Sequence, residues 1–158
     1  MPEYLVWFAR SNSYYNFRFA ELAAVCDLAC AQAGLPWALL PEPGCSTPPT
    51  ALSDKPYARV RLPSAEIAAR VAARSVLIRV ILEVIGEGET HDAAIAAVDT
   101  FLTPSLWVAG QASFAWRIGA FGKKHSVQEK ETLYALYGRI LPAELTVDLK
   151  SPDIALWV

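Results

Sequence analysis

The hydrophobic and polar positions of this chain alternate between strand-like and helix-like spacing, and they predict the order β-α-β-β-α-β in the first half. Residues 4–10 are apolar at both alternating phases, which predicts a strand buried in the middle of a sheet. Residues 57–62 alternate strictly between apolar and polar side chains, which predicts a strand with one exposed face. Further strands are expected at residues 37–40 and 76–85, and helices at residues 18–33 and 64–74.

The same order is that of a ferredoxin-like unit, in which two helices lie on one face of an antiparallel sheet. Residues 41–56 contain five prolines and one glycine, so they are expected to form a long loop between the second and third strands. The glycines of Gly86-Glu87-Gly88 are interpreted as a strand-ending turn, because no third glycine follows to complete a nucleotide-binding fingerprint. We expect the first domain to cover residues 1–88.

The second half of the chain predicts the order α-β-α-β-β. A helix is expected at residues 90–101 and a strand at 113–121. Ser126 and Glu129 have the spacing of a capping box, so a second helix is expected to start there and to run to about residue 141. Strands are expected at 145–149 and 154–158, on either side of a polar turn. We therefore expect a second domain over residues 89–158, truncated at its C-terminal strand, in one part of a longer protein.

The composition allows a folded core and excludes several classes of protein. Apolar residues make up 54% of the 158 residues and charged residues 19%, so the chain is not expected to be disordered. The longest apolar run, residues 76–85, contains two charges and is shorter than the roughly 20 residues that a membrane helix needs. The N-terminus has no basic leader before an apolar stretch, so a cytoplasmic protein without membrane contact is expected.

Cysteine and histidine are not expected to bind a metal in this chain. Cys26 and Cys30 lie four residues apart on a predicted helix, but no histidine is close in sequence, and core packing is the expected role of both. His91 and His125 stand in polar segments and are expected at the solvated surface. The carboxylates have structural explanations, such as pairing of Glu66 along its helix, so we expect neither a catalytic residue nor a cofactor here.

The basic residues are the best candidates for a binding site. A formal charge of −2 and a pI near 5.7 exclude a uniformly basic nucleic-acid binder, so any such site is a local patch. Lys123, Lys124 and His125 precede a helix start, where backbone N–H groups attract anions. Lys150 lies in the final turn, and Arg117 belongs to the strand that precedes the basic loop.

A second basic patch is predicted on the exposed face of the strand at residues 57–62. Arg59 and Arg61 share that face, and Tyr57 lies beside them as an aromatic ring on which a base could stack. For each of these basic side chains, the alternative to a binding role is an ordinary charge at the solvated surface.

The order of several short motifs resembles the N-terminal region of the catalytic subunit of tRNA guanosine-10 N2-methyltransferases. Residues 147–153 (VDLKSPD), between a helix and an apolar strand, resemble the closing strands of THUMP domains, which are RNA-binding modules of tRNA-modifying enzymes. The similarity covers most of the chain except the Pro-rich loop and residues 101–112. The other segments that carry it are residues 4–9 (YLVWFA), 17–22 (FRFAEL), 62–70 (LPSAEIAAR) and 85–88 (IGEG).

The resemblance implies a ferredoxin-like domain and a THUMP domain that precede an S-adenosylmethionine-dependent methyltransferase domain. The D-P-P-Y-type motif of that catalytic domain is absent, since the only adjacent prolines are Pro48 and Pro49. The chain is then the part that grips the acceptor end of tRNA. Its implied partners are tRNA, the methyltransferase domain and, through that domain, a small zinc-binding activator subunit. Two alternatives stay open, namely a protein-interaction scaffold that retains the fold and a ferredoxin-like domain that binds a small anion through Arg59 and Arg61.

Overall fold

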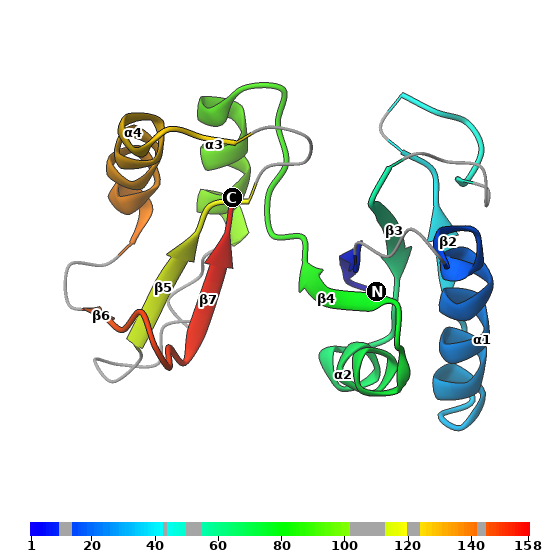
Figure 1. Cartoon of the computed structure of the whole chain (residues 1–158). Helices are drawn as coiled ribbons and strands as arrows, with labels where there is room; N and C mark the ends of the chain where they lie inside the picture. The colour runs from blue at the N-terminus through cyan, green and yellow to red at the C-terminus, as the bar shows by residue number, and fades with distance from the viewer. Residues whose placement is uncertain (10–13, 43, 50–54, 102–112, 120–123, 142–144) are drawn as a thin grey trace. The chain divides into compact units, whose positions relative to one another are not determined.

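The computed structural model has a mixed α+β fold and divides into two compact units (Figure 1). Unit 1 comprises Met1–Val84 and unit 2 comprises Ile85–Val158. The sequence pattern places the division after Gly88, within the same connection. The residues that the structure describes are 1–9, 14–42, 44–49, 55–101, 113–119, 124–141 and 145–158.

Unit 1 is a four-stranded antiparallel sheet with two helices on one face (Figure 1). The strand order is β2-β3-β1-β4, which is the order of a ferredoxin-like unit, so the predicted topology of this half is confirmed. Its elements are β1 (Glu3–Phe8), a 3-10 turn (Tyr15–Phe17), α1 (Arg18–Ala31), β2 (Ala38–Leu40), β3 (Tyr57–Arg61), α2 (Ala65–Arg74) and β4 (Ile78–Glu83).

The core of unit 1 lies between the sheet and the helices. On β1 only every second side chain is buried, and Val6 at 0% exposure contrasts with the half-buried Leu5 and Trp7 on the opposite face. The expectation of a strand buried on both faces is therefore wrong, because the helices cover only one side of the sheet. β3 alternates as predicted. The buried residues of this core include Tyr4, Val6, Phe8, Phe19, Leu22, Ala58, Val60, Leu62, Ile67 and Val71.

The helix ends follow local signals in the sequence. The Ser64 hydroxyl accepts a hydrogen bond from the Ile67 N–H at 3.3 Å, so the predicted cap of α2 is confirmed. Helix α1 ends at Ala31, two residues before the predicted end at Ala33. Gly34 follows with a φ of +66°, a conformation that glycine adopts without strain.

Strand β4 begins later than predicted because a carboxylate of α1 accepts hydrogen bonds from the backbone N–H groups just before the strand. Glu21 accepts hydrogen bonds from the backbone N–H groups of Val76 and Leu77, at 2.8 and 3.0 Å. Its carboxylate also accepts a hydrogen bond from the Ser75 hydroxyl at 2.5 Å. The strand therefore starts at Ile78, and Val76 is exposed. Glu21 thus connects α1 to the start of β4.

The two helical cysteines pack into the core as predicted. Cys26 and Cys30 are 0% and 2% exposed. Burial, with smaller contributions from Cys30 and Asp27, raises the pKa of the Cys26 thiol to about 12. A thiol with this pKa stays protonated at neutral pH and is a poor metal ligand, since metals bind the thiolate.

Unit 2 has the predicted order α-β-α-β-β. Its three-stranded sheet has the order β6-β5-β7, and both outer strands run parallel to β5, so the last two strands flank β5 rather than pairing with each other. The elements are α3 (His91–Phe101), β5 (Ser113–Arg117), α4 (Val127–Tyr137), a 3-10 turn (Gly138–Ile140), β6 (Thr146–Val147) and β7 (Ile154–Trp157).

The capping box of α4 is confirmed, and α4, β5 and β6 are shorter than predicted. The Ser126 hydroxyl accepts from the Glu129 N–H at 3.2 Å, and the Glu129 carboxylate accepts from the Ser126 N–H at 2.8 Å. Helix α4 tightens to a 3-10 turn at Gly138. Strand β5 ends at Arg117, and residues 120–121, the last two of the predicted strand, lie outside the described residues. Strand β6 comprises only Thr146–Val147.

The two glycines after β4 allow the chain to pass close to α3. A Cβ atom on Gly86 would lie 2.4 Å from Val98 Cγ2, and one on Gly88 would lie 2.4 Å from the backbone nitrogen of Ala94. The absence of a side chain at both positions is therefore a packing requirement. No cofactor is needed to explain the glycine pair.

We expect Gly88→Ala to lower the free energy of unfolding of unit 2 by roughly 1–3 kcal/mol, because the added methyl group meets backbone rather than a flexible side chain. Gly138→Ala is the matched control, since nothing lies within 4 Å of its added Cβ and its φ is −59°. The control should be neutral or stabilising by up to about 1 kcal/mol. Urea unfolding measures both variants, and equal effects would contradict the close packing of Gly88.

Candidate nucleic-acid interface

The turn between β6 and β7 is organised by the side chain of Asp148. Its Oδ1 accepts hydrogen bonds from the backbone N–H groups of Lys150 at 2.8 Å and Ser151 at 3.1 Å. Its own N–H donates to the Phe114 carbonyl of β5 at 3.0 Å. A carboxylate that bonds to the backbone two and three residues on closes a turn and ends the strand. This turn explains why β6 is short, and it fixes the backbone that carries Lys150.

A second carboxylate holds the end of the turn against β5. Asp153 Oδ2 accepts from the backbone N–H of Ser113 at 2.8 Å and from the Ser113 hydroxyl at 2.7 Å. The same hydroxyl accepts from the Asp153 N–H at 3.1 Å. The hydrogen bonds from Ser113 lower the pKa of Asp153, and those from Ser151 and Lys150 lower the pKa of Asp148. Both carboxylates are therefore charged at neutral pH.

Arg117 lies against the same turn. Its Nη2 donates a hydrogen bond to the Leu149 carbonyl at 2.8 Å, and the residue is half-buried on β5. Lys150, the next residue along the chain, is exposed. The structure therefore brings the guanidinium of Arg117 to the segment that carries Lys150. The sequence predicts each residue separately as a contact, and it does not predict that they belong to one site. We name Arg117 and the segment Asp148–Asp153 the turn site.

The basic loop before α4 is the second part of the predicted interface. Lys124 is exposed, whereas the side chain of His125 is only 19% exposed, so the expectation of a solvated His125 is wrong. His125 Nδ1 lies 3.9 Å from the Glu129 carboxylate, which also accepts from the Ser126 N–H. His125 thus lies partly buried beside the capping box at the start of α4. Lys123 lies outside the described residues.

The turn Asp148–Asp153 and the start of α4 lie at opposite ends of the sheet of unit 2, and the side chain of Arg117 extends from the α4 end toward the turn. The Gly119 N–H donates to the Val158 carbonyl at 2.8 Å, so the chain leaves β5 beside the end of β7 before it enters the loop. The turn instead meets the first residues of β5. Figure 1 shows the turn at one end of β5 and β7 and the chain entering α4 at the other end. A strand of this length spans about 16 Å, so the turn and the basic loop are well separated along the sheet.

An aromatic cluster connects the three elements around the loop. The Tyr137 hydroxyl of α4 and His91 Nδ1 of α3 are 3.0 Å apart, and their rings meet edge to face. The ring of Trp116 on β5 lies 5.6 Å from that of Tyr137. His91 remains exposed, as predicted, and burial raises the pKa of Tyr137. This cluster packs the C-terminal end of α4 against β5 and α3.

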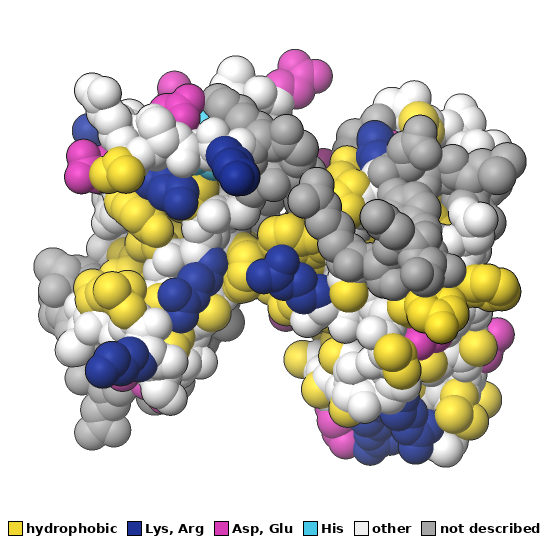
Figure 2. Space-filling view, in the orientation of Figure 1, with side chains coloured by type: hydrophobic (Ala, Val, Ile, Leu, Met, Phe, Trp, Pro, Cys, Tyr) yellow, Lys and Arg dark blue, Asp and Glu magenta, His cyan; other side chains and the backbone are white. Residues whose placement is uncertain are grey.

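Unit 2 is acidic in spite of its basic groups. It contains six Lys or Arg and nine Asp or Glu residues, a formal charge of −3, whereas unit 1 has eight basic and seven acidic residues. On the face in view, Figure 2 shows the Lys and Arg side chains of unit 2 as separate groups rather than as a continuous strip. Contact with an anion in this unit therefore depends on local arrangement.

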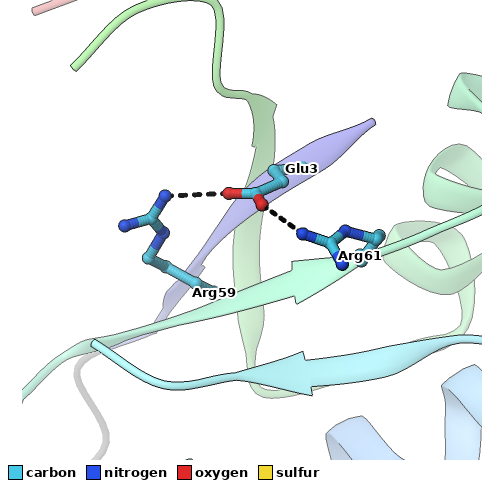
Figure 3. Close-up of polar contacts among 3 residues, drawn as sticks. All are labelled: Glu3, Arg59 and Arg61. Carbon is cyan, nitrogen blue, oxygen red and sulfur yellow. Dashed lines mark hydrogen bonds and ion pairs between the residues drawn. The ribbon is translucent and has the colours of Figure 1, made fainter. Parts of the chain in front are cut away.

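The second predicted patch on β3 is paired with an acidic residue that the sequence pattern missed. Glu3 of β1 accepts hydrogen bonds from Arg59 at 2.8 Å and from Arg61 at 2.6 Å (Figure 3). The hydrogen bond from Arg61, followed by that from Arg59, lowers the pKa of Glu3, although partial burial opposes this. Glu3 is the direct cross-strand partner of Arg61. Only the register of the two strands shows this pairing, because 55 or more positions separate the residues in sequence.

Two negative findings hold for the described part of the chain. No group of three or more His, Cys, Asp or Glu side chains is arranged there to bind a metal ion. None of the helices in those ranges has the length and apolar character needed to cross a bilayer.

The fold and its second unit place the chain among proteins with a ferredoxin-like unit followed by a THUMP-like unit. The family model described as "Tmrp11 THUMP N-terminal domain" matches residues 50–158, which include all of unit 2. Because this match covers more than half of the chain, the chain belongs to that family. A THUMP domain indicates a role in binding tRNA.

A solved structure supports the fold over nearly the whole chain. The crystal structure of PH1313 from Pyrococcus horikoshii matches with a TM-score of 0.59 and 15% sequence identity. The match covers 99% of this chain and 50% of the other chain, so the present chain spans half of the length of PH1313. No curated protein matches.

The lowered pKa values of Asp148 and Asp153 predict how the turn responds to acid. Each carboxylate stabilises the folded turn in full at pH values above its ordinary pKa of 3.8. This stabilisation is lost as the pH falls through the lower pKa that the carboxylate has in the folded chain. We expect the amide resonances of Ser113 and Lys150 to titrate below pH 3.8 in an acid NMR titration. Asp153→Asn should abolish the response at Ser113 and keep that at Lys150. Midpoints at or above 3.8 would contradict the assigned hydrogen bonds.

Proposed function

We propose that this chain is the tRNA-recognising part of a tRNA guanine-10 N2-methyltransferase, and that it positions tRNA through its acceptor end for a catalytic domain outside this sequence. The family match, which includes all of unit 2, is the observation that carries the proposal. It favours RNA binding over a scaffold and over a small-anion-binding domain. The choice of guanine 10 as the target base rests on the resemblance in sequence.

Arg117 and Lys150 of the turn site are proposed to contact phosphate. A guanidinium has five N–H donors in a planar fork, so Arg117 can donate to the Leu149 carbonyl and to a phosphate oxygen. Lys150 is exposed on a backbone that Asp148 holds in a closed turn. A cation on a fixed backbone loses less conformational entropy on binding than one on a mobile loop.

Lys123 and Lys124 are proposed as a second phosphate contact, with His125 beside them. The capping box already satisfies the Glu129 N–H, and the Glu129 carboxylate lies at the helix start. The lysine side chains, rather than the backbone N–H groups of α4, therefore carry the attraction for phosphate. This refines the expectation from the sequence, in which the helix dipole and the loop charges act together.

We propose that catalysis, and binding of the partners that catalysis needs, belong to a domain outside this sequence. The resemblance implies S-adenosylmethionine in the catalytic domain and a small zinc-binding activator subunit that grips that domain. The D-P-P-Y-type motif is absent from these 158 residues, and we assign no chemical step to them. We propose that the chain acts in the cytoplasm, where it binds tRNA without modifying it.

We expect this chain alone to bind tRNA weakly. Unit 2 carries a formal charge of −3, so its basic groups attract RNA against a repulsive background. Affinity at physiological salt should be in the range of non-specific binding, about 10⁻⁴ to 10⁻⁶ M, and should fall as salt increases.

The variant Lys123→Ala/Lys124→Ala and the variant Lys150→Ala should each weaken tRNA binding and reduce its salt dependence. Each lost phosphate contact lowers the slope of log affinity against log salt by about 0.9 on duplex RNA, taking the value for duplex DNA as a guide. Fluorescence anisotropy with labelled tRNA at several salt concentrations measures both effects.

Arg74→Ala is the matched control for these variants. It removes one exposed positive charge from α2 of unit 1, so it changes the net charge without touching the turn site or the basic loop. A control effect as large as that of Lys150→Ala would show that only net charge matters, which contradicts the assigned contacts.

A further inference from the structure

The face of the unit 1 sheet that lies opposite the helices combines aromatic rings with positive charge. Tyr4, Val6 and Phe8 of β1 point into the core, so the alternate residues Trp7 and Leu5 lie on the other face. The same alternation puts Tyr57, Arg59 and Arg61 of β3 on this face. Figure 3 shows Arg59, Arg61 and Glu3 meeting on one side of the two strands. We name this surface the open sheet face.

Two aromatic rings occupy neighbouring positions on the two central strands. Trp7 of β1 and Tyr57 of β3 are direct cross-strand partners, and both are half-buried. Neighbouring strands lie about 4.8 Å apart, so the two side chains start from adjacent points of the sheet. Central strands of a four-stranded sheet are where RNA-recognition motifs carry the aromatic residues that stack on bases.

One positively charged side chain lies near each ring. The guanidinium carbon of Arg79 lies 5.0 Å from the centre of the Trp7 ring, and Lys55 Nζ lies 5.7 Å from the centre of the Tyr57 ring. Both distances fall within the range of a cation–π interaction. The rings are therefore held in a positive environment, and the same cations can reach the phosphates on either side of a stacked base.

The charges on this face favour an anionic partner. Arg59, Arg61, Arg79 and Lys55 are opposed by two carboxylates, those of Glu3 and Glu42. Glu3 holds the two guanidinium groups of β3 side by side, because it accepts a hydrogen bond from each of them. Unlike the acidic unit 2, this surface is thus locally positive.

We propose that the open sheet face binds single-stranded RNA, with Trp7 and Tyr57 stacking on successive bases and Arg61, Arg79 and Lys55 contacting phosphate. A single strand fits because its bases can turn their flat faces toward the rings. A duplex keeps those faces stacked inside the helix, so its phosphates alone could contact the sheet. The site lies in unit 1 and is independent of the proposed tRNA contacts of unit 2.

The test is binding of a labelled, unstructured oligonucleotide of about eight nucleotides to the full chain. Two matched ligands separate the contributions, namely an abasic strand of equal length, which keeps the phosphates, and a short RNA hairpin with a fully paired stem. We expect the intact oligonucleotide to bind at least several-fold more tightly than either. Equal binding of all three would show attraction by charge alone and would overturn the proposal, as would no binding of the oligonucleotide.

Variants on the face locate the site. Tyr57→Ala should weaken oligonucleotide binding by roughly tenfold, whereas Tyr57→Phe, which keeps the ring, should change it little. Arg79→Gln should reduce the salt slope by about 0.7, the value for one phosphate of a single strand. Arg74→Gln, the same change on the helical side of the sheet, should have no effect on the slope. Thermal unfolding confirms that each variant is folded.

The contrary outcomes are equally clear. If Tyr57→Ala and Tyr57→Phe bind the oligonucleotide alike, the ring does not stack on a base and the proposal fails. If Arg74→Gln lowers the slope as much as Arg79→Gln, the binding surface is not the open sheet face. The variant Arg139→Gln, which removes an exposed positive charge from the 3-10 turn of unit 2, should keep oligonucleotide binding, and loss of binding in that variant would place the strand on unit 2 instead.

Discussion

The basic groups of unit 2 depend on the hydrogen bonds that two carboxylates accept around the start of β5. Asp148 closes the turn after β6, and Asp153 bonds to both the backbone and the hydroxyl of Ser113. Through these bonds the chain crosses the first residues of β5 and continues as a parallel strand on its other side. Lys150 is carried by the turn, and Arg117 reaches its backbone at Leu149. The same carboxylates contribute to the acidic charge that limits how strongly this unit attracts RNA.

The two units differ in how their positive side chains are arranged. Unit 2 matches a THUMP family model over its whole length, yet its positive side chains are few and separated. In unit 1, Glu3 aligns Arg59 and Arg61 on the sheet face that also carries Trp7 and Tyr57. The two units therefore differ in how closely their positive side chains are gathered.

Local signals allowed much of the fold to be predicted from the sequence. The cap at Ser64 and the capping box at Ser126 involve residues three positions apart, and both are confirmed. The wrong predictions concern features that depend on residues far apart in the sequence. Strand β4 starts late because Glu21 binds the backbone before it, and β1 is buried on one face only because both helices lie on the same side. Glu3 is visible in the sequence, but its pairing with Arg59 and Arg61 follows only from the strand register.

The central claim is that this chain docks tRNA through its acceptor end. The most direct measurement is a titration of fluorescent tRNA, and of the same tRNA trimmed of its single-stranded acceptor end, into the purified chain at low and at moderate salt. Docking through the acceptor end predicts that binding falls on trimming and falls again as salt increases. Equal affinity for intact and trimmed tRNA, or binding that ignores salt, would contradict it.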